Sequence, residues 1–229
     1  MFSPDRSWSP AINWDAPAGR TLRKLIEALP AEHEFVIGLF GSAPLQLGLD
    51  PGFVSGDMDL FCEPPVEEFV RAARLDKESS PELYVQCCVE GNFRTSPRWR
   101  TRACQLRIAN CTVTIPHPID ILIAKLHRCD DKDLRAFRLV IERTGHPTED
   151  ELRRELQVAV DLYRPNFDEE MSSDITTGTR LMWNEIFGHD IDVRREIIAP
   201  ALARRREGYA DDVARADYKA ELRRLGGAE

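Results

Sequence analysis

The stretch FVIGLFGSAPLQLGLDPGFVSGDMDLFC, residues 35–62, decides the fold that we expect for this chain. It begins with a short apolar run, FVIGLF, which is typical of a buried β-strand. Ser42 follows this run and is a favourable N-cap, so we expect a short helix over residues 42–49. Polar and apolar residues alternate over residues 57–62, which predicts a second strand. The stretch therefore predicts a strand, a helix and a strand in succession.

The periodicity of the other apolar residues predicts a mixed unit of helices and strands, and then helices alone. The expected fold class is α/β (α+β), with a mixed sheet, flanking helices and a helical C-terminal part. We expect an N-terminal arm and helix (1–30), a mixed core (31–116) and a helical C-terminal region (117–229). Further strands are expected at residues 83–90, 104–108 and 112–115. Further helices are expected at residues 21–29, 66–75, 119–128, 131–143, 149–163, 177–187, 193–206 and 211–225.

The composition limits the class of protein. A chain of 229 residues, 42% of them hydrophobic and 31% charged, is expected to be soluble and globular. No apolar run approaches the roughly 20 residues of a membrane span, and the first residues carry no apolar leader, so we expect a cytoplasmic protein without a membrane partner. The net charge of -8 does not attract nucleic acid, so RNA binding would need a local basic patch. The six cysteines form no CxxC pair, and we expect reduced, buried thiols.

Asp57 and Asp59 are expected to project from the same face of the second strand, because side chains alternate between the faces of a strand. Two neighbouring carboxylates repel each other unless a cation lies between them, and hard oxygen ligands suit Mg²⁺. Mg²⁺ in turn binds phosphates and stabilises charge during phosphoryl transfer. The alternative is that the two acids pair with arginines and have only a structural role.

Gly41 and Ser42 lie at the junction between the first strand and the expected helix. Backbone N–H groups at a helix start are unpaired and bind phosphate oxygens. Gly41 lets the backbone approach a ligand closely, and the Ser42 hydroxyl can donate to a phosphate. The alternative is an ordinary N-cap. The order of this turn and the acid pair is more specific than either feature alone.

These residues resemble the pattern of the nucleotidyltransferase superfamily that shares the palm of DNA polymerase β. In that pattern a hydrophobic residue precedes Gly and then Gly or Ser, and after a spacer two acids alternate with hydrophobic residues. Here Phe40–Ser42 is followed by Asp57–Leu60, with a spacer slightly longer than usual. The resemblance implies that Ser42 binds a phosphate of an NTP, and that Asp57 and Asp59 hold Mg²⁺.

The segment HPIDILIAKL, residues 117–126, continues to Arg128, Lys132 and Asp133. It resembles a segment of uncharacterised bacterial nucleotidyltransferases, among them proteins similar to AbiEii-type toxins. This resemblance implies an antitoxin as a partner. On one continuous helix Lys125, Arg128 and Lys132 would share a face and could hold a triphosphate. The alternative is a solvated stripe on a packed helix.

Active members of this superfamily usually add a third carboxylate from a later strand, which often acts as the base. Glu90 is our first candidate, because it shares a face of the expected strand 83–90 with Gln86. Asp120 is the second, although it lies at an expected helix start, where Asp is common. Without a third acid, the chain would bind Mg-nucleotide but transfer poorly or not at all.

A basic segment lies between residues 91 and 118, which contain no Asp or Glu. Arg98, Trp99, Arg100 and Arg102 interleave arginines with an aromatic ring, which suits phosphate contacts and base stacking. The alternative is a surface hairpin whose arginines pair with acids elsewhere. No HExxH, GxSxG or Walker-type sequence is present, so a zinc hydrolase and a P-loop enzyme are not expected.

The first function that we expect is transfer of a nucleoside monophosphate from an NTP to an acceptor hydroxyl, with release of pyrophosphate. The acceptor would be RNA, a protein side chain or a small molecule. The second is a catalytically inactive relative that binds nucleotides or another protein. A third is a structural α/β protein whose acid pair only meets arginines.

Overall fold

The computed structural model describes residues 8–80, 83–164 and 174–214 of the chain. Its five strands are β1 (Phe35–Leu39), β2 (Asp57–Glu63), β3 (Tyr84–Cys87), β4 (Cys104–Ile108) and β5 (Cys111–Ile115). They form one mixed sheet in the order β3-β2-β1-β5-β4. The central strand β1 runs antiparallel to β2 and parallel to β5, while β3 is parallel to β2 and β4 is antiparallel to β5. The mixed α/β fold class is therefore confirmed.

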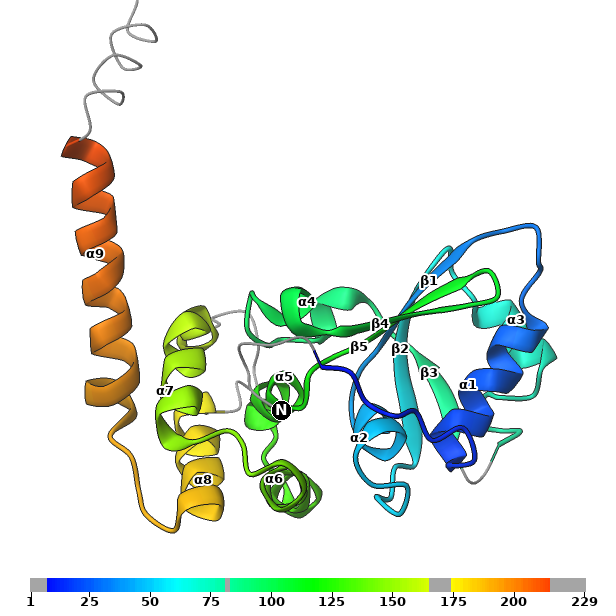
Figure 1. Cartoon of the computed structure of the whole chain (residues 1–229), viewed down its shortest axis with the longest axis horizontal. Helices are drawn as coiled ribbons and strands as arrows, with labels where there is room; N and C mark the ends of the chain where they lie inside the picture. Colours follow the sequence, from blue (N-terminus) through cyan, green and yellow to red (C-terminus); the bar gives the residue numbers. More distant parts are fainter. Residues whose placement is uncertain (1–7, 81–82, 165–173, 215–229) are drawn as a thin grey trace, which may run out of the picture.

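Helices of the N-terminal half cover one face of this sheet. They are α1 (Pro17–Ala28), α2 (Ala43–Gly48) and α3 (Glu67–Ala72). Figure 1 shows α1 and α3 side by side against the strands. Leu22 and Leu25 of α1 are fully buried in a cluster with Ile37 of β1 and with Met58 and Leu60 of β2. This face of the sheet is therefore the core, and the alternate residues of β2 point to the opposite face.

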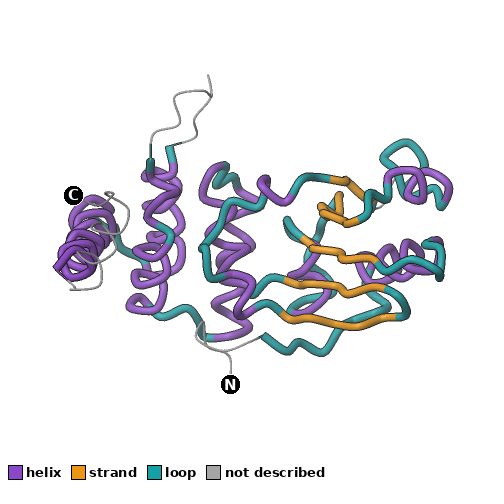
Figure 2. Tube along the Cα trace, turned by 90° about the horizontal axis from the view of Figure 1, so that it is seen from above, coloured by secondary structure: helices purple, strands orange, loops and turns teal. Residues whose placement is uncertain are grey.

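The chain after β5 is helical. A short helix, α4 (Trp99–Arg102), precedes β4, and the later helices are α5 (Pro118–Ala124), α6 (Asp131–Thr144), α7 (Glu149–Val158), α8 (Ile175–Phe187) and α9 (Ala199–Ala214). Figure 2 shows the C-terminal helices beside the sheet. They enclose a second apolar cluster that contains Phe137 and Trp183. Leu45 of α2 belongs to this cluster, whereas Leu47 belongs to the first, so α2 contacts both halves.

Several expected helices differ from the structure. The helix expected at 119–128 ends at Ala124 and continues as a 3₁₀ turn over Lys125–His127. Cys129 then has a positive φ of 49°, and the Asp130 side chain accepts the Asp133 N–H and caps α6. The chain therefore turns between two separate helices. Near the C-terminus, a π-helical turn over Arg194–Ile198 leads directly into α9, which continues to Ala214. The helices expected at 193–206 and 211–225 are therefore not separated by a break. Residues 215–225 of the second lie outside the described residues.

One expected strand of the N-terminal half is also corrected. The strand expected at 83–90 ends at Cys87, and Glu90 begins a 3₁₀ turn over Glu90–Asn92. The N-terminal arm lies against the core in its described part. The Trp8 N–H donates to the Arg102 carbonyl at 2.8 Å, and the ring is buried. Residues 1–7 of this arm lie outside the described residues.

The six cysteines are free thiols, but the expectation that they are buried holds only in part, because Cys87, Cys88 and Cys129 are half-buried. Burial raises the pKa of Cys62 and of Cys88 to about 12, so both remain protonated near neutral pH. Within residues 8–80, 83–164 and 174–214, no helix has the length and apolar character to span a bilayer.

Candidate active site

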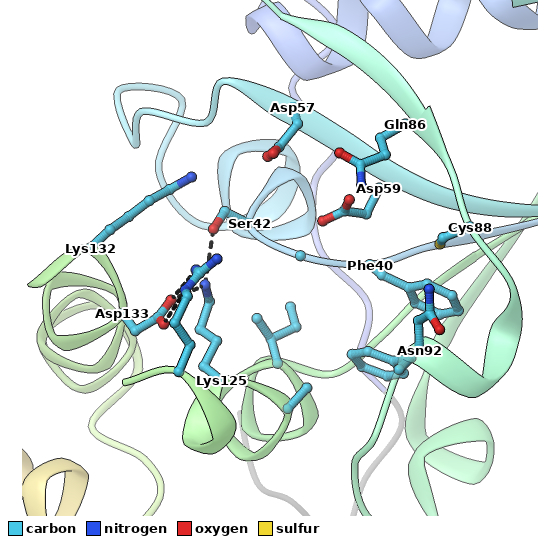
Figure 3. Close-up of a pocket in the computed structure, with 15 residues that line it drawn as sticks. Phe40, Ser42, Asp57, Asp59, Gln86, Cys88, Asn92, Lys125, Lys132 and Asp133 are labelled. Atoms are coloured by element: carbon cyan, nitrogen blue, oxygen red, sulfur yellow. Dashed lines mark hydrogen bonds and ion pairs between the residues drawn. The ribbon is translucent and has the colours of Figure 1, made fainter. Parts of the chain in front are cut away.

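A cavity of about 270 Å³ lies between the open face of the sheet and the first C-terminal helices (Figure 3). Its wall is built from segments that are far apart in the sequence. The sheet contributes Asp57 and Asp59 of β2, and the turn after β1 contributes Gly41 and Ser42. The helical part contributes Lys125, Arg128, Lys132 and Asp133.

The two acids lie on the exposed face of β2, as their alternation predicts. Asp57 and Asp59 are half-buried, whereas Met58 and Leu60 between and after them are fully buried. Burial raises the pKa of Asp59, and the neighbouring Asp57 carboxylate raises it further. The cations Lys125, Lys132 and Arg128 oppose this rise. The two carboxylates therefore repel each other, and a bound cation would reduce this repulsion.

Gly41 brings the turn after β1 directly against this acid pair. It has a positive φ of 63°, and a Cβ atom at this position would overlap with Oδ2 of Asp59. The preceding Phe40 N–H donates to the Asp59 carbonyl at 2.8 Å. Only glycine has both the backbone freedom and the space for this approach. The structure thus places the Gly-Ser turn and the carboxylates side by side.

Ser42 occupies the N-cap position of α2, but its hydroxyl does not cap the helix. The Lys125 ammonium donates to the Ser42 Oγ at 3.1 Å and to Oδ1 of Asp133 at 2.6 Å. Ser42 is buried and points toward the cavity (Figure 3). Because α2 has only six residues, a phosphate here would be held mainly by side chains rather than by a helix dipole.

Asp133 holds two of the cavity's cations in place. Arg128 donates to both of its oxygens, at 3.0 and 2.9 Å, while Lys125 contacts the same carboxylate. Burial opposes ionisation of Asp133, but Arg128 and Lys125 together outweigh it and hold the pKa of Asp133 below its ordinary value. Burial lowers the pKa of Lys125, and the Asp133 charge limits this fall. The cluster is therefore charged and fixed before any ligand binds.

Lys132 reaches the same cavity from α6. Figure 3 shows its ammonium extended toward the space beneath Asp57. The expectation that Lys125, Arg128 and Lys132 share one helix face is wrong, because the chain turns at Cys129. They nevertheless line one cavity, since the turn folds the start of α6 back against the end of α5.

The third carboxylate of the superfamily is not found beside the acid pair among the described residues. Glu90 lies outside the cavity and forms an ion pair with Arg100, because β3 ends before it. The strand register instead pairs Asp59 with Gln86, whose side chain lines the cavity. The position next to Asp59 therefore carries an amide instead of an acid.

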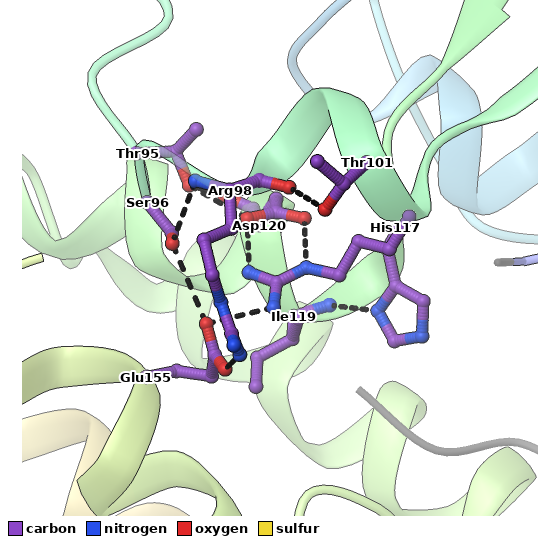
Figure 4. Close-up of polar contacts among 9 residues, drawn as sticks. Thr95, Ser96, Arg98, Thr101, His117, Ile119, Asp120 and Glu155 are labelled. Atoms are coloured by element: carbon purple, nitrogen blue, oxygen red, sulfur yellow. Dashed lines mark hydrogen bonds and ion pairs between the residues drawn. The ribbon is translucent and has the colours of Figure 1, made fainter. Parts of the chain in front are cut away.

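Asp120 is also excluded from the cavity, because it is part of a buried ion-pair network (Figure 4). Arg102 donates to its two carboxylate oxygens at 2.7 and 2.6 Å, and contacts Glu155 of α7 at 2.7 Å. Arg102 and Glu155 are only 3% and 2% exposed, and Asp120 is fully buried. Burial raises the pKa of Asp120 in spite of the contacts with Arg102. This network joins α4, α5 and α7.

The basic segment is therefore largely structural. Arg102 is not available to nucleic acid, because it is buried in the network, and Arg98 pairs with Glu155. Arg100 remains exposed, although it pairs with Glu90 and lies over the Trp99 ring at 5.1 Å. The expected alternative, in which these arginines meet acids, describes the segment better, although it forms a short helix and not a hairpin.

Trp99 packs against Phe40 and Phe93 instead of presenting an exposed ring for base stacking. Phe40 and Phe93 stack with ring centroids 4.5 Å apart, and the Trp99 ring meets Phe93 edge-on at 5.3 Å. Phe40 and Asn92 line the cavity at the end away from Lys132 (Figure 3), and Phe93, stacked on Phe40, is also part of the lining. No sequence pattern pointed to Phe93 or Asn92, because they belong to an irregular segment. Gln86 could have been found from its alternation with Tyr84 along β3.

The residues fit a Mg²⁺ ion in part. Asp57 and Asp59 offer oxygen ligands on one wall, and the Gln86 amide oxygen lies beside them (Figure 3). Within the described ranges, no group of three or more His, Cys, Asp or Glu residues could hold a metal ion. An ion here would therefore take its remaining ligands from phosphate oxygens and water, which is common for Mg²⁺.

Comparison with models of known protein families, with curated proteins and with solved structures found no match. The functional argument therefore depends on the cavity itself.

Proposed function

We propose that this chain is a Mg²⁺-dependent nucleotidyltransferase, which moves a nucleoside monophosphate from an NTP to an acceptor hydroxyl. The observation that carries the proposal is the contact between the Gly41 turn and the Asp59 carboxylate in a cavity that three cations also line. The cavity combines a turn that admits a ligand, the acid pair and three cations, two of which a third acid, Asp133, holds in place. This set matches the needs of a Mg-triphosphate. An ordinary core would not leave these charges facing a common space.

The residues of the cavity have separate roles in this proposal. Asp57 and Asp59 hold Mg²⁺, while Ser42, Lys125, Arg128 and Lys132 bind the β- and γ-phosphates. The ion would neutralise charge on the phosphate oxygens. Asn92 and Phe40 lie at the end of the cavity away from Lys132, and the nucleobase would lie at that end. Asp133 binds no substrate, and it positions Lys125 and Arg128.

The reaction that this arrangement supports is a single displacement at the α-phosphorus. The acceptor oxygen forms a new P–O bond as the bond between the α-phosphorus and the bridging oxygen breaks. Pyrophosphate leaves with that bonding pair, next to the cations. The hydroxyl proton passes to a carboxylate of the acid pair or to solvent, since neither Glu90 nor Asp120 lines the cavity.

A catalytically inactive, nucleotide-binding module is the second candidate, and a specific observation favours it. Gln86 pairs with Asp59 where a third acid would complete the site, and an amide cannot accept the proton of an attacking hydroxyl. This module would bind Mg-nucleotide in the same cavity without turnover. RNA or protein as the acceptor is part of this proposal, and an antitoxin as a partner depends on the resemblance of the sequence alone.

Incubation with NTPs labelled at the α-phosphate, in the presence of Mg²⁺ and mixed RNA and protein acceptors, separates the two candidates. The wild-type chain, the double variant Asp57→Asn/Asp59→Asn and the control Glu27→Gln are compared. Glu27 is an exposed acid on α1, so its variant tests loss of an acid outside the cavity. Label transfer by the wild type and control, but not by the double variant, supports the enzyme.

Binding of Mg-NTP without label transfer or pyrophosphate release supports the module. Calorimetry measures this binding directly, and loss of heat in the double variant places the nucleotide at the acid pair. Equal nucleotide binding by the wild type and the double variant would contradict both candidates.

A further inference from the structure

A second hollow adjoins the candidate active site along the outer side of α6. It has a volume of about 670 Å³, and it lies between α6 and the loop before β2. Lys132 lines both this hollow and the cavity beside Asp57. We call this second hollow the α6 groove, lined by Asp50, Gly52, Phe53, Val54, Lys132, Arg135, Arg138, Leu139 and Glu142. A molecule in the groove would therefore lie next to the catalytic space.

The loop wall of the α6 groove is held in place before any ligand binds. The Gln46 side chain donates to the Phe53 carbonyl at 2.8 Å, and the Gly52 N–H donates to Asp50 at 2.9 Å. Arg143 of α6 reaches across to the same Asp50 carboxylate at 2.9 Å. These contacts tie the loop both to α2 and to α6, so the groove is a formed feature of the fold.

The helix wall carries a row of cations. Lys132, Arg135 and Arg138 follow one another at intervals of three residues and span about 9 Å of the helix axis. Arg138 is paired with Glu185 at 2.8 Å. Among the side chains of residues 8–80, 83–164 and 174–207, neither the Lys132 ammonium nor the Arg135 guanidinium has an ion pair. Two positive charges therefore face the groove without a partner among those residues, in a chain whose net charge is -8.

The loop wall is apolar where it faces these cations. Val54 is 79% exposed, and Phe53 beside it is half-buried. The two walls thus differ, with positive charge on α6 and apolar surface on the loop. Arg143 neutralises Asp50, while the exposed Glu142 adds one carboxylate to the α6 wall, so the three cations of this wall still outnumber its acid.

We propose that the α6 groove binds a single strand of nucleic acid whose terminal hydroxyl enters the cavity as the acceptor. This inference rests on the proposed function, and it names its substrate class. A single strand has phosphates along one side and flat bases along the other, which matches the cationic wall and the apolar wall. An acidic peptide would use the cations but has no regular apolar face for Phe53 and Val54.

The inference is tested by fluorescence anisotropy with labelled single-stranded RNA and DNA and with a labelled acidic peptide. The variant is Arg135→Glu, because Arg135 is exposed and lies outside the cavity. We expect the dissociation constant of this variant for the strand to rise at least about tenfold. The slope of log affinity against log salt concentration should become shallower by about 0.7 for each phosphate that the variant no longer neutralises. Arg135→Lys should recover most of the affinity.

Arg71→Glu is the matched control, because Arg71 is an exposed arginine on α3, on the far side of the sheet. It changes the total charge equally and should leave strand binding unchanged. Comparison of the RNA and DNA strands shows which sugar the groove accepts. Equal strand binding by Arg135→Glu and wild type, the absence of strand binding by wild type, or preference for the acidic peptide would each overturn the inference.

Mg-NTP binding is measured on the same samples, so that failure of this inference and failure of the proposed function are distinguished. The groove inference predicts that Arg135→Glu keeps wild-type Mg-NTP binding while its strand binding weakens. A wild-type chain that binds Mg-NTP but no strand disproves the groove alone. A chain that binds the strand but no Mg-NTP disproves the proposed nucleotidyltransferase, and with it the role of the strand as acceptor.

Discussion

Gly41 and Asp59 are in contact in the candidate active site, with no space for a side chain between them. A Cβ atom on Gly41 would lie 3.3 Å from Cγ of Asp59 and would overlap with one of its oxygens. The positive φ of 63° adds a second restriction, because side-chain-bearing residues rarely adopt it. The position of the acid and the conformation of the turn are therefore linked.

Gly41→Ala is expected to displace Asp59 and to weaken Mg-NTP binding at least about tenfold, a loss of about 1.4 kcal/mol. The backbone strain alone should lower the free energy of unfolding by about 1–2 kcal/mol. Gly145→Ala is a matched control, because Gly145 has a similar φ of 67° but nothing within 4 Å of an added Cβ. It should be destabilised similarly and bind Mg-NTP normally. If both variants bind normally in calorimetry, the contact has no role in the site.

Lys125→Met is expected to impair both folding and binding. It removes one partner of the buried Asp133 carboxylate, and breaking a buried pair costs about 3–5 kcal/mol. Because Arg128 still contacts Asp133, we expect the lower end of this range. Mg-NTP binding should also weaken at least about tenfold. Urea denaturation and calorimetry measure the two effects.

Lys132→Met provides the comparison for Lys125→Met. Lys132 is half-buried, and its ammonium has no ion pair with another described residue, so the free energy of unfolding should change by less than about 0.5 kcal/mol. Mg-NTP binding should still weaken. A large loss of stability in Lys132→Met would show that this lysine has a structural role.

Arg102→Met is expected to destabilise the chain by about 3–5 kcal/mol, because Asp120 and Glu155 would lose the guanidinium between them in a buried site. Arg100→Met, on the same short helix, should change stability by less than about 1 kcal/mol, since its ion pair with Glu90 is exposed. Urea denaturation of both variants checks the contrast. Equal stability of the two would contradict the structural role assigned to Arg102.

The stability of the wild-type chain is expected to fall as the pH falls below about 6.5, because His117 is held neutral. Burial, and then the positive charge of Arg102, lower the pKa of His117 to about 3. Between pH 6.5 and 3 the unfolded chain binds a proton that the folded chain excludes, so folding is disfavoured there. The loss amounts to about 2 kcal/mol at pH 5.

His117→Asn should lack this part of the pH dependence. The His117 Nδ1 accepts the Ile119 N–H at the start of α5, and Asn is also a favourable N-cap residue, so the helix start is preserved. Urea denaturation at pH 7.5 and pH 5 compares the two chains. An equal fall in stability for wild type and variant would show that other groups cause it.

The sequence by itself determined the local features of the site. A period of two placed Asp57 and Asp59 on one face of β2, and an apolar run followed by Gly41 and Ser42 specified the strand and the turn. Such patterns are set by neighbouring residues, so a short window of sequence contains them. The mixed sheet with flanking helices followed from the same reasoning.

Only the tertiary structure decided which charges face the cavity. Ser42 meets Lys125 across 83 residues of sequence, and Arg98 meets Glu155 across 57. No local period reports such pairs, because they depend on how the C-terminal helices pack against the sheet. For the same reason Arg102 had the sequence context of a nucleic-acid ligand, although the fold buries it between two acids.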